Sequence, residues 1–184
     1  MSLWLPEDNV HLITPLSEEH LSEFSCDSDL NEYFHKNAID NEDELISKNY
    51  VFAEKETGFP CAIFTVSNAE IKSCNEIDMA ISSNSRYKTY PAVRIGRLAT
   101  HEKRMRQGIG SKLLLFIKVW FTISNKTGCR FIVVDSRKDA ISFYKKNGFE
   151  DYLENDPNSK YSILIYDLKA FSLNLKRSTL KIEA

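Results

Sequence analysis

The spacing of apolar residues predicts where helices and strands lie along the chain. Apolar positions three or four residues apart are typical of a helix with one buried face, and alternating or unbroken apolar runs are typical of strands. Helical spacing predicts helices at about residues 18–24, 27–41 and 109–121, and a short one that carries Ala140, Phe143 and Tyr144. Strand patterns occur at residues 10–14, 50–54, 61–67, 92–99, 131–134 and 161–168.

Residues 92–134 follow the order strand, helix, strand. The run 131–134 is apolar throughout and mostly β-branched, which is typical of a strand that is buried on both faces of a parallel sheet. We therefore predict a βαβ unit with a right-handed crossover. Within residues 92–99 the apolar parity slips between Ile95 and Leu98, and such a slip predicts a β-bulge, a feature that often lies beside active sites.

Polar residues and glycines mark the ends of the predicted helices. Ser17 and Asp27 suit N-cap positions, residues 136–139 have the pattern of a capping box, and Gly148 suits the left-handed position after a helix. Residues 74–89 are polar and show no period. We predict a long, substrate-specific loop there.

The composition predicts one globular domain. The chain has 184 residues, of which 42% are hydrophobic and 27% charged, so it can form a packed core. We find no secretory signal, and the longest apolar run, residues 113–123, is interrupted by Lys118 and too short to span a bilayer. We expect a cytoplasmic protein with no membrane partner. The four cysteines form no CxxC pair and the histidines show no ligand spacing, so we expect reduced cysteines and no metal.

The charge is divided unevenly along the chain. Residues 1–70 hold fifteen acidic and three basic side chains, and residues 71–184 hold eleven acidic and twenty-one basic ones, which gives about −12 and +10. The basic part would attract an anion such as a nucleotide phosphate, and the acidic part a cation. Alternatively, the two parts neutralise each other in the fold.

A basic segment followed by Gly108-Ile109-Gly110 precedes the helix at 109–121. Glycines allow a ligand to approach the backbone, and the first N–H groups of a helix attract anions. Two known nucleotide motifs are excluded, because position 113 is leucine and no glycine stands at the Walker A spacing. Two interpretations of this glycine segment remain: a phosphate-binding site, or a tight turn that binds no ligand. The neighbouring cations are Lys103, Arg104, Arg106 and Lys112.

Three segments together resemble the core of the GNAT acetyltransferases. They are 97–99 (Arg-Leu-Ala), 107–114 (Gln-Gly-Ile-Gly-Ser-Lys-Leu-Leu) and 140–149 (Ala-Ile-Ser-Phe-Tyr-Lys-Lys-Asn-Gly-Phe). The resemblance implies an α/β (α+β) fold, with a mixed, mostly antiparallel sheet, a splayed parallel strand pair and flanking helices. It also implies acetyl-CoA as cosubstrate and a primary amine as acceptor. Met105 departs from the family, which usually has Gln or Arg there.

The resemblance also assigns roles to single residues. Tyr144 matches the general acid that protonates the departing thiolate, and a backbone N–H near Leu98 would stabilise the oxyanion. The general base stays open among Glu102, His101, Tyr90 and water. The positions that the resemblance places at the cofactor are Leu98, Ala99, Thr100, Arg104, Arg106, Gln107, Gly108, Ile109, Gly110 and Ser111.

A second resemblance, to the GNAT toxins of toxin–antitoxin modules, covers more of the chain. It rests on segments 24–34 and 90–99. It implies acetylation of the amino group of aminoacyl-tRNA and control by a small antitoxin. However, the pI of about 6.1 is low for a tRNA-binding protein, and the acidic first 70 residues suit a small cationic amine or a basic antitoxin segment. A non-catalytic acyl-CoA-binding regulator is the third possibility.

We predict a GNAT domain at residues 1–168 and a basic extension at 169–184. The extension has alternating Phe171, Leu173 and Leu175, which fits an added strand, an arm that binds a partner, or a tail. The acceptor, the acyl chain length and the oligomeric state, a homodimer among the options, stay open.

Overall fold

The computed structural model describes residues 11–81, 87–123, 125, 127–152 and 158–173. The chain forms two compact units: unit 1 holds Met1–Ser67 and Ile95–Trp120, and unit 2 holds Asn68–Arg94 and Phe121–Ala184. The strands of the described residues are β1 (His11–Pro15), β2 (Lys48–Glu54), β3 (Pro60–Lys72), β4 (Thr89–Thr100), β5 (Phe131–Arg137), β6 (Glu150–Asp151) and β7 (Tyr161–Asp167).

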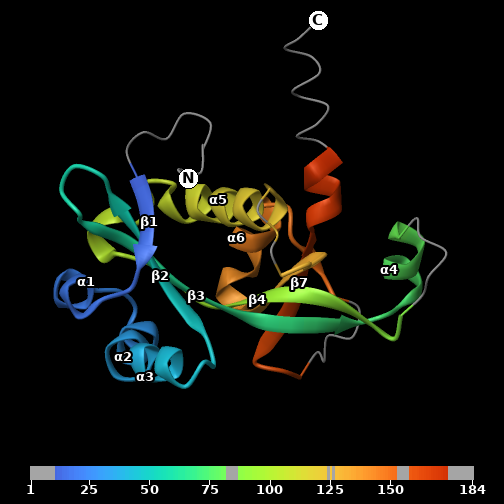
Figure 1. Cartoon of the computed structure of the whole chain (residues 1–184), viewed down its shortest axis with the longest axis horizontal. Helices are drawn as coiled ribbons and strands as arrows, with labels where there is room; N and C mark the ends of the chain where they lie inside the picture. Colours follow the sequence, from blue (N-terminus) through green and yellow to red (C-terminus); the bar gives the residue numbers. More distant parts are fainter. Residues whose placement is uncertain (1–10, 82–86, 124, 126, 153–157, 174–184) are drawn as a thin grey trace, which may run out of the picture. The chain divides into compact units, whose positions relative to one another are not determined.

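These strands pair in the order β1-β2-β3-β4-β5-β7-β6 (Figure 1). The pairs are antiparallel apart from β4 and β5, which are parallel. The mixed, mostly antiparallel sheet with flanking helices is therefore confirmed. Strands β3 and β4 are long and contribute residues to both units.

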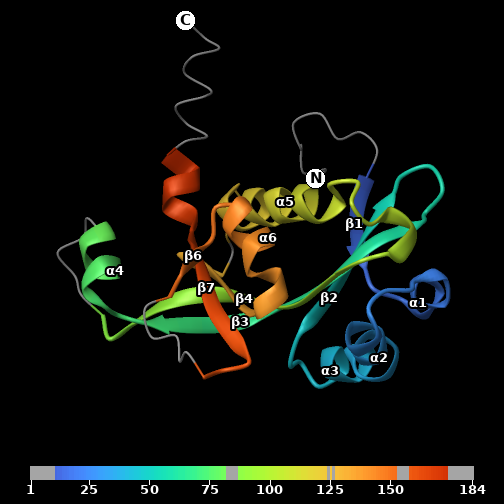
Figure 2. The same ribbon diagram turned by 180° about the vertical axis from the view of Figure 1, so that it is seen from behind.

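In unit 1, helices cover both faces of the strands. Successive side chains of a strand point to opposite faces, and Val51 and Ala53 of β2 pack against three short helices, α1 (Glu18–Glu23), α2 (Ser28–Lys36) and α3 (Ala38–Asp43). Tyr50 lies on the other face, and its ring centroid is 5.0 Å from that of Trp120 in α5 (Ile109–Ile123). Figures 1 and 2 show α5 and the three short helices on opposite sides of β2.

The predicted helix at residues 27–41 is in fact two helices. Asn37, with φ −125° and ψ −22°, separates α2 from α3. The side-chain amide of Asn49 in β2 donates to the Ala38 carbonyl at 2.6 Å, and the Asn49 N–H donates to Glu42 at 2.9 Å. These hydrogen bonds attach α3 directly to β2.

The predicted N-caps of α1 and α2 are correct in position only. Ser17 and Asp27 precede the two helices, but neither side chain bonds to the helix backbone. The Ser17 hydroxyl lies 2.7 Å from Nδ1 of His20 instead.

In unit 2, β5 is buried on both faces, as predicted. Phe131 and Val133 belong to a core cluster with Tyr90 and residues of α4 (Asn75–Ala80). Ile132 pairs with Tyr166 of β7, and Tyr166 contacts Phe149 directly after α6 (Ile141–Lys146), with ring centroids 5.4 Å apart. The alternate side chains of β5 therefore pack against opposite layers.

The predicted capping box at residues 136–139 in unit 2 is wrong. Ser136 does not begin a capping box, because it is paired within β5 with Ser162 and its hydroxyl donates to the Arg137 carbonyl at 2.9 Å. The 3₁₀ helix η2 (Lys138–Ala140) stands between β5 and α6.

The segment 74–89 is not one irregular loop. It contains α4, because Ile77 and Ile81 lie one turn apart and both enter the unit 2 core. The later part of the predicted loop, residues 82–86, lies outside the described residues.

The end of the chain is described as far as residue 173, and residues 168–173 are helical. The segment begins as a helix and not as the added strand that alternation allowed. The domain boundary at residue 168 stays a prediction. None of the described helices is long and apolar enough to cross a membrane.

Candidate functional site

The connection between β4 and α5, residues 101–108, contains two left-handed residues. We call this segment the β4–α5 loop. Arg106 has φ +60° and Gly108 has φ +78°. The Lys112 N–H donates to the Gly108 carbonyl at 3.0 Å. The first N–H groups of a helix have no partner within the helix, and in α5 they belong to Ile109, Gly110 and Ser111. The left-handed turn therefore leads into a helix start that can bind an anion.

Arg104 connects the β4–α5 loop to β2. Its Nε and Nη2 both donate to Oε1 of Glu54, at 3.1 and 2.7 Å, and its guanidinium lies 4.8 Å from the centre of the Phe59 ring. The bond to Glu54 raises the pKa of Arg104, and the pKa of Glu54 is lowered by the Thr57 hydroxyl first and by Arg104 next. A carboxylate thus neutralises Arg104, whereas Arg106 is exposed.

Sequence patterns did not reveal Glu54. It lies 50 residues before Arg104, at the end of a strand, and no periodicity connects the two positions. The role of Glu54 becomes visible only in the folded chain, where β2 brings its carboxylate next to the basic β4–α5 loop.

The four candidates for a general base differ in what already binds them. His101 is 1% exposed, and both of its ring nitrogens are in hydrogen bonds, to the Glu23 carbonyl at 2.9 Å and from the Lys103 N–H at 3.0 Å. Tyr90 is buried and donates to Asp78 at 2.8 Å. Glu102 is exposed. Glu102 and a water molecule therefore remain as candidates for the general base.

The β4 positions predicted at the cofactor fall into two groups. Leu98 and Thr100 are half-buried, while Ala99 is buried in the unit 1 core. Ile109 is also buried, at 5% exposure. Ala99 and Ile109 can therefore offer a ligand only their backbone. Burial along β4 changes parity between Ala92 and Val93, so the bulge near Leu98 stays a prediction.

Tyr144 of unit 2 is fixed by the end of α6. The Phe149 N–H donates to the Tyr144 carbonyl at 3.1 Å and the Gly148 N–H to the Lys145 carbonyl at 2.9 Å, with Gly148 at φ +80°. This pair of bonds is a Schellman motif, and its usual apolar contact is made by the rings of Tyr144 and Phe149, 5.4 Å apart. Burial raises the pKa of Tyr144 to about 12.

An exposed arginine lies on the α2 side of β4. The Arg97 guanidinium stands 4.7 Å from the centre of the Tyr33 ring, and its Nη1 donates to the Gly96 carbonyl at 2.7 Å. Stacking on a ring holds the cation in place while its edge faces solvent. Tyr33 in turn accepts a bond from Asn41 at 3.2 Å.

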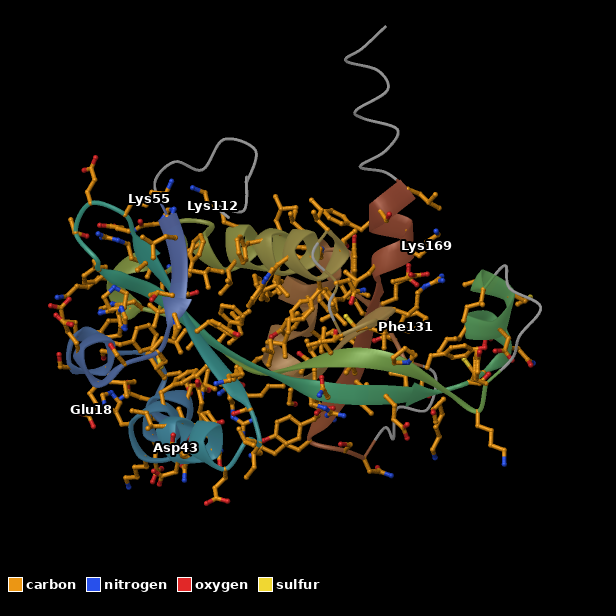
Figure 3. All side chains as sticks on the ribbon, in the orientation of Figure 1. Glu18, Asp43, Lys55, Lys112, Phe131 and Lys169 are labelled. Atoms are coloured by element: carbon orange, nitrogen blue, oxygen red, sulfur yellow. The ribbon has the colours of Figure 1, made fainter. Side chains whose placement is uncertain are left out.

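Two acids and two lysines of unit 1 lie on opposite sides of its strands. Figure 3 shows Glu18 and Asp43 on the side that carries α1 and α3, and Lys55 and Lys112 on the opposite side. Lys112, in the first turn of α5, therefore lies on the side opposite the acids of α1 and α3.

The family model of the GNAT acetyltransferase domain matches residues 50–151, more than half of the chain. The chain belongs to the GNAT acetyltransferase family. The match runs from β2 to β6 and includes both the β4–α5 loop and Tyr144. A search of curated proteins found no match.

Solved structures share this GNAT fold over most of the chain. A tyrosine-to-phenylalanine mutant of KacT is 21% identical, with a TM-score of 0.71, and the match covers 90% of this chain and 99% of that one. AtaT complexed with acetyl-methionyl-tRNAfMet is 20% identical, with a TM-score of 0.72 and the same coverage. A mutant AtaT toxin bound to the C-terminus of the antitoxin AtaR and acetyl-CoA is 20% identical, with a TM-score of 0.69, covering 90% and 98%. At these identities the likeness establishes the fold.

Proposed function

We propose that this GNAT protein transfers the acetyl group of acetyl-CoA to the α-amino group of aminoacyl-tRNA. The observation that carries the cofactor part is the left-handed turn at Arg106 and Gly108. It leads into α5, and the first N–H groups of a helix have no partner within the helix. The acceptor part is supported by the family and by the likeness to AtaT, whose structure holds acetyl-methionyl-tRNAfMet.

The β4–α5 loop fits the pyrophosphate of acetyl-CoA. Backbone N–H groups of Ile109, Gly110 and Ser111 would donate to phosphate oxygens, and the dipole of the 15-residue helix α5 adds to the attraction. Arg106 supplies an exposed positive charge. Arg104 acts indirectly, because Glu54 engages its guanidinium.

The reaction needs positioning, charge stabilisation and one proton donor. Backbone groups at Leu98 and Thr100 would hold the pantetheine, and an N–H near Leu98 would stabilise the negative charge that develops on the thioester oxygen. The amine nitrogen attacks the thioester carbon, the carbon–sulfur bond breaks, and Tyr144 gives a proton to the departing sulfur. The raised pKa of Tyr144 keeps its hydroxyl protonated at neutral pH. Glu102 or water takes the proton that the amine loses.

Arg97 supports a nucleic acid acceptor. An exposed arginine stacked on an aromatic ring is suited to a phosphate or to a base stacked on its plane. We therefore assign Arg97 and Tyr33 to the 3′ end of the tRNA. We propose that the protein acts on tRNA in the cytoplasm and that a basic segment of an antitoxin inhibits it.

The acidic side of unit 1 favours a second candidate acceptor. Glu18 and Asp43 lie on the helices that cover the α2 side of the strands (Figure 3), and a negative surface attracts small cationic amines such as polyamines. The acetyl transfer would then be the same and only the acceptor would differ.

One assay distinguishes these acceptors. Radiolabelled acetyl-CoA is offered with charged total tRNA, with uncharged tRNA, and with a panel of polyamines and lysine peptides. Label on charged tRNA alone supports the proposal. Label on small amines alone shows a metabolic or protein acetyltransferase, and cofactor binding without any transfer shows a non-catalytic regulator. Arg97→Gln should raise the KM for charged tRNA and leave the KM for acetyl-CoA unchanged.

A further inference from the structure

His101 connects two helices that are far apart in the sequence. The Lys103 N–H donates to Nδ1 of His101, so Nδ1 carries no proton and Nε2 carries it. Nε2–H therefore donates to the carbonyl of Glu23, the last residue of α1. One imidazole thus serves as N-cap of the 3₁₀ helix η1 (Glu102–Arg104) and binds a carbonyl that the end of α1 leaves without a helical partner.

Further contacts join the same two segments. The Glu102 N–H donates at 2.9 Å to the carbonyl of Ser25, two residues after the end of α1. The Phe24 ring stands edge-on to the His101 ring, with centroids 5.5 Å apart, and the Phe59 ring is tilted by 45° against it, with centroids 4.8 Å apart. We call these contacts between residues 23–25 and residues 101–102 the α1 junction. Because His101 is 1% exposed, water cannot easily replace the bonds it makes.

The β4–α5 loop needs such an anchor. Its later part runs through two left-handed residues, Arg106 and Gly108. Its first part is hydrogen-bonded to α1, to Cys61 and to Glu54. A left-handed conformation is unfavourable for a residue with a Cβ, so the turn at Arg106 persists only when the surrounding contacts hold it.

We propose that His101 is a positioning residue that couples the β4–α5 loop, where the acetyl-CoA phosphates would bind, to α1 through the α1 junction. The inference rests on the proposed function of the β4–α5 loop. Coupling between two sites is reciprocal. Acetyl-CoA binding therefore stabilises α1, and a partner that displaces α1 weakens acetyl-CoA binding.

Two variants of His101 and one control variant test its two hydrogen bonds. His101→Asn keeps an acceptor that suits an N-cap but is too short to reach the Glu23 carbonyl. His101→Phe keeps the ring packing and loses both bonds. His20→Asn is the matched control, because His20 lies in α1 and its side-chain contact is with Ser17, beside the same helix. Thermal unfolding checks that each variant is folded.

We expect His101→Asn to raise the dissociation constant and the KM of acetyl-CoA roughly tenfold, the loss of one buried hydrogen bond, with kcat nearly unchanged. Acetyl-CoA should slow amide hydrogen exchange in α1 of the wild-type protein and of His20→Asn but not of His101→Asn. A role in folding alone would not change this ligand response.

Each outcome decides between the proposals. If the wild type binds acetyl-CoA and His101→Asn binds it equally well, with the same slowing of exchange in α1, the coupling is refuted and the loop assignment stands. If the wild type does not bind acetyl-CoA, the proposed function fails and the coupling fails with it. Should His101→Phe not fold, the asparagine variant still decides.

Discussion

The burial of Tyr144 serves both the packing of the core and the proposed proton transfer. The side chain is 9% exposed and contacts Phe143 and Phe149, and this burial raises its pKa to about 12. The residue is both a core tyrosine and a phenol that stays protonated at neutral pH. A place in the core and a role as proton donor are therefore compatible at Tyr144.

Tyr144→Phe removes the proton donor and keeps the ring. We expect kcat to fall about 10²- to 10⁴-fold, the usual contribution of a general acid, with an unchanged dissociation constant for acetyl-CoA. Steady-state release of CoA and calorimetric titration measure the two quantities. Tyr166→Phe is the control, because Tyr166 also contacts Phe149 and has no proposed chemical role. A parallel loss of turnover and affinity would exclude the general-acid role.

Gly108→Ala tests the left-handed turn, with Gly58→Ala as its matched control. The two glycines have φ +78° and +74°, and an added Cβ meets nothing within 4 Å at either position. Both changes should lower the free energy of unfolding by a similar amount, roughly 1–2 kcal/mol. We expect only Gly108→Ala to lose affinity for acetyl-CoA, because its methyl group would occupy the phosphate approach. Equal affinities in the two variants would contradict the loop assignment.

At the scale of elements, short helices depend on their ends and their neighbours. Helix α6 has six residues, too few for stability on its own, and the Schellman motif and the Tyr144–Phe149 contact complete it. Helix α4 is equally short and exists because Ile77 and Ile81 enter the unit 2 core. The first could be predicted from Gly148, whereas the second could not be predicted from a mostly polar segment.

Gly148→Ala should destabilise unit 2 more than Gly58→Ala destabilises unit 1. Both have a positive φ, but a Cβ at position 148 would also lie 3.2 Å from Cε2 of Tyr166. We expect a loss above the roughly 1–2 kcal/mol of the left-handed strain, measured by urea unfolding. Because the motif positions Tyr144, kcat should fall as well. An equal loss in the two variants would show that Tyr166 moves aside freely.

At the scale of the whole molecule, Lys118 makes stability depend on pH. It is 7% exposed in α5, and burial lowers its pKa to about 8, whereas an unfolded chain has a value of about 10.4. Between these pH values the unfolded chain binds more protons than the folded one. The contribution of Lys118 to stability therefore rises with pH through this window.

Lys118→Met should remove this dependence. We expect the variant to be more stable than the wild type by up to roughly 3 kcal/mol at pH 7, with the difference shrinking as the pH approaches 10. Urea unfolding of both proteins at pH 7, 8.5 and 10 gives the difference directly, and the contributions of other titrating groups cancel in it. A difference that is constant with pH would show that burial does not perturb Lys118.

The sequence by itself determined the features that depend on neighbouring residues. Helical spacing placed α5, an unbroken apolar run placed β5, and Gly108 and Gly148 adopt the left-handed conformations that glycine favours. The motifs around them led to the correct family. These signals are local, because a period or a turn is encoded within a few residues of chain.

The tertiary structure decided everything that depends on contacts through space. The break between α2 and α3 follows from bonds to Asn49, and strand pairing keeps Ser136 out of a helix cap. Arg104 meets Glu54 across 50 residues, and His101 meets Glu23 across 78. Such pairs leave no periodic trace in the sequence, because folding and not spacing brings the partners together.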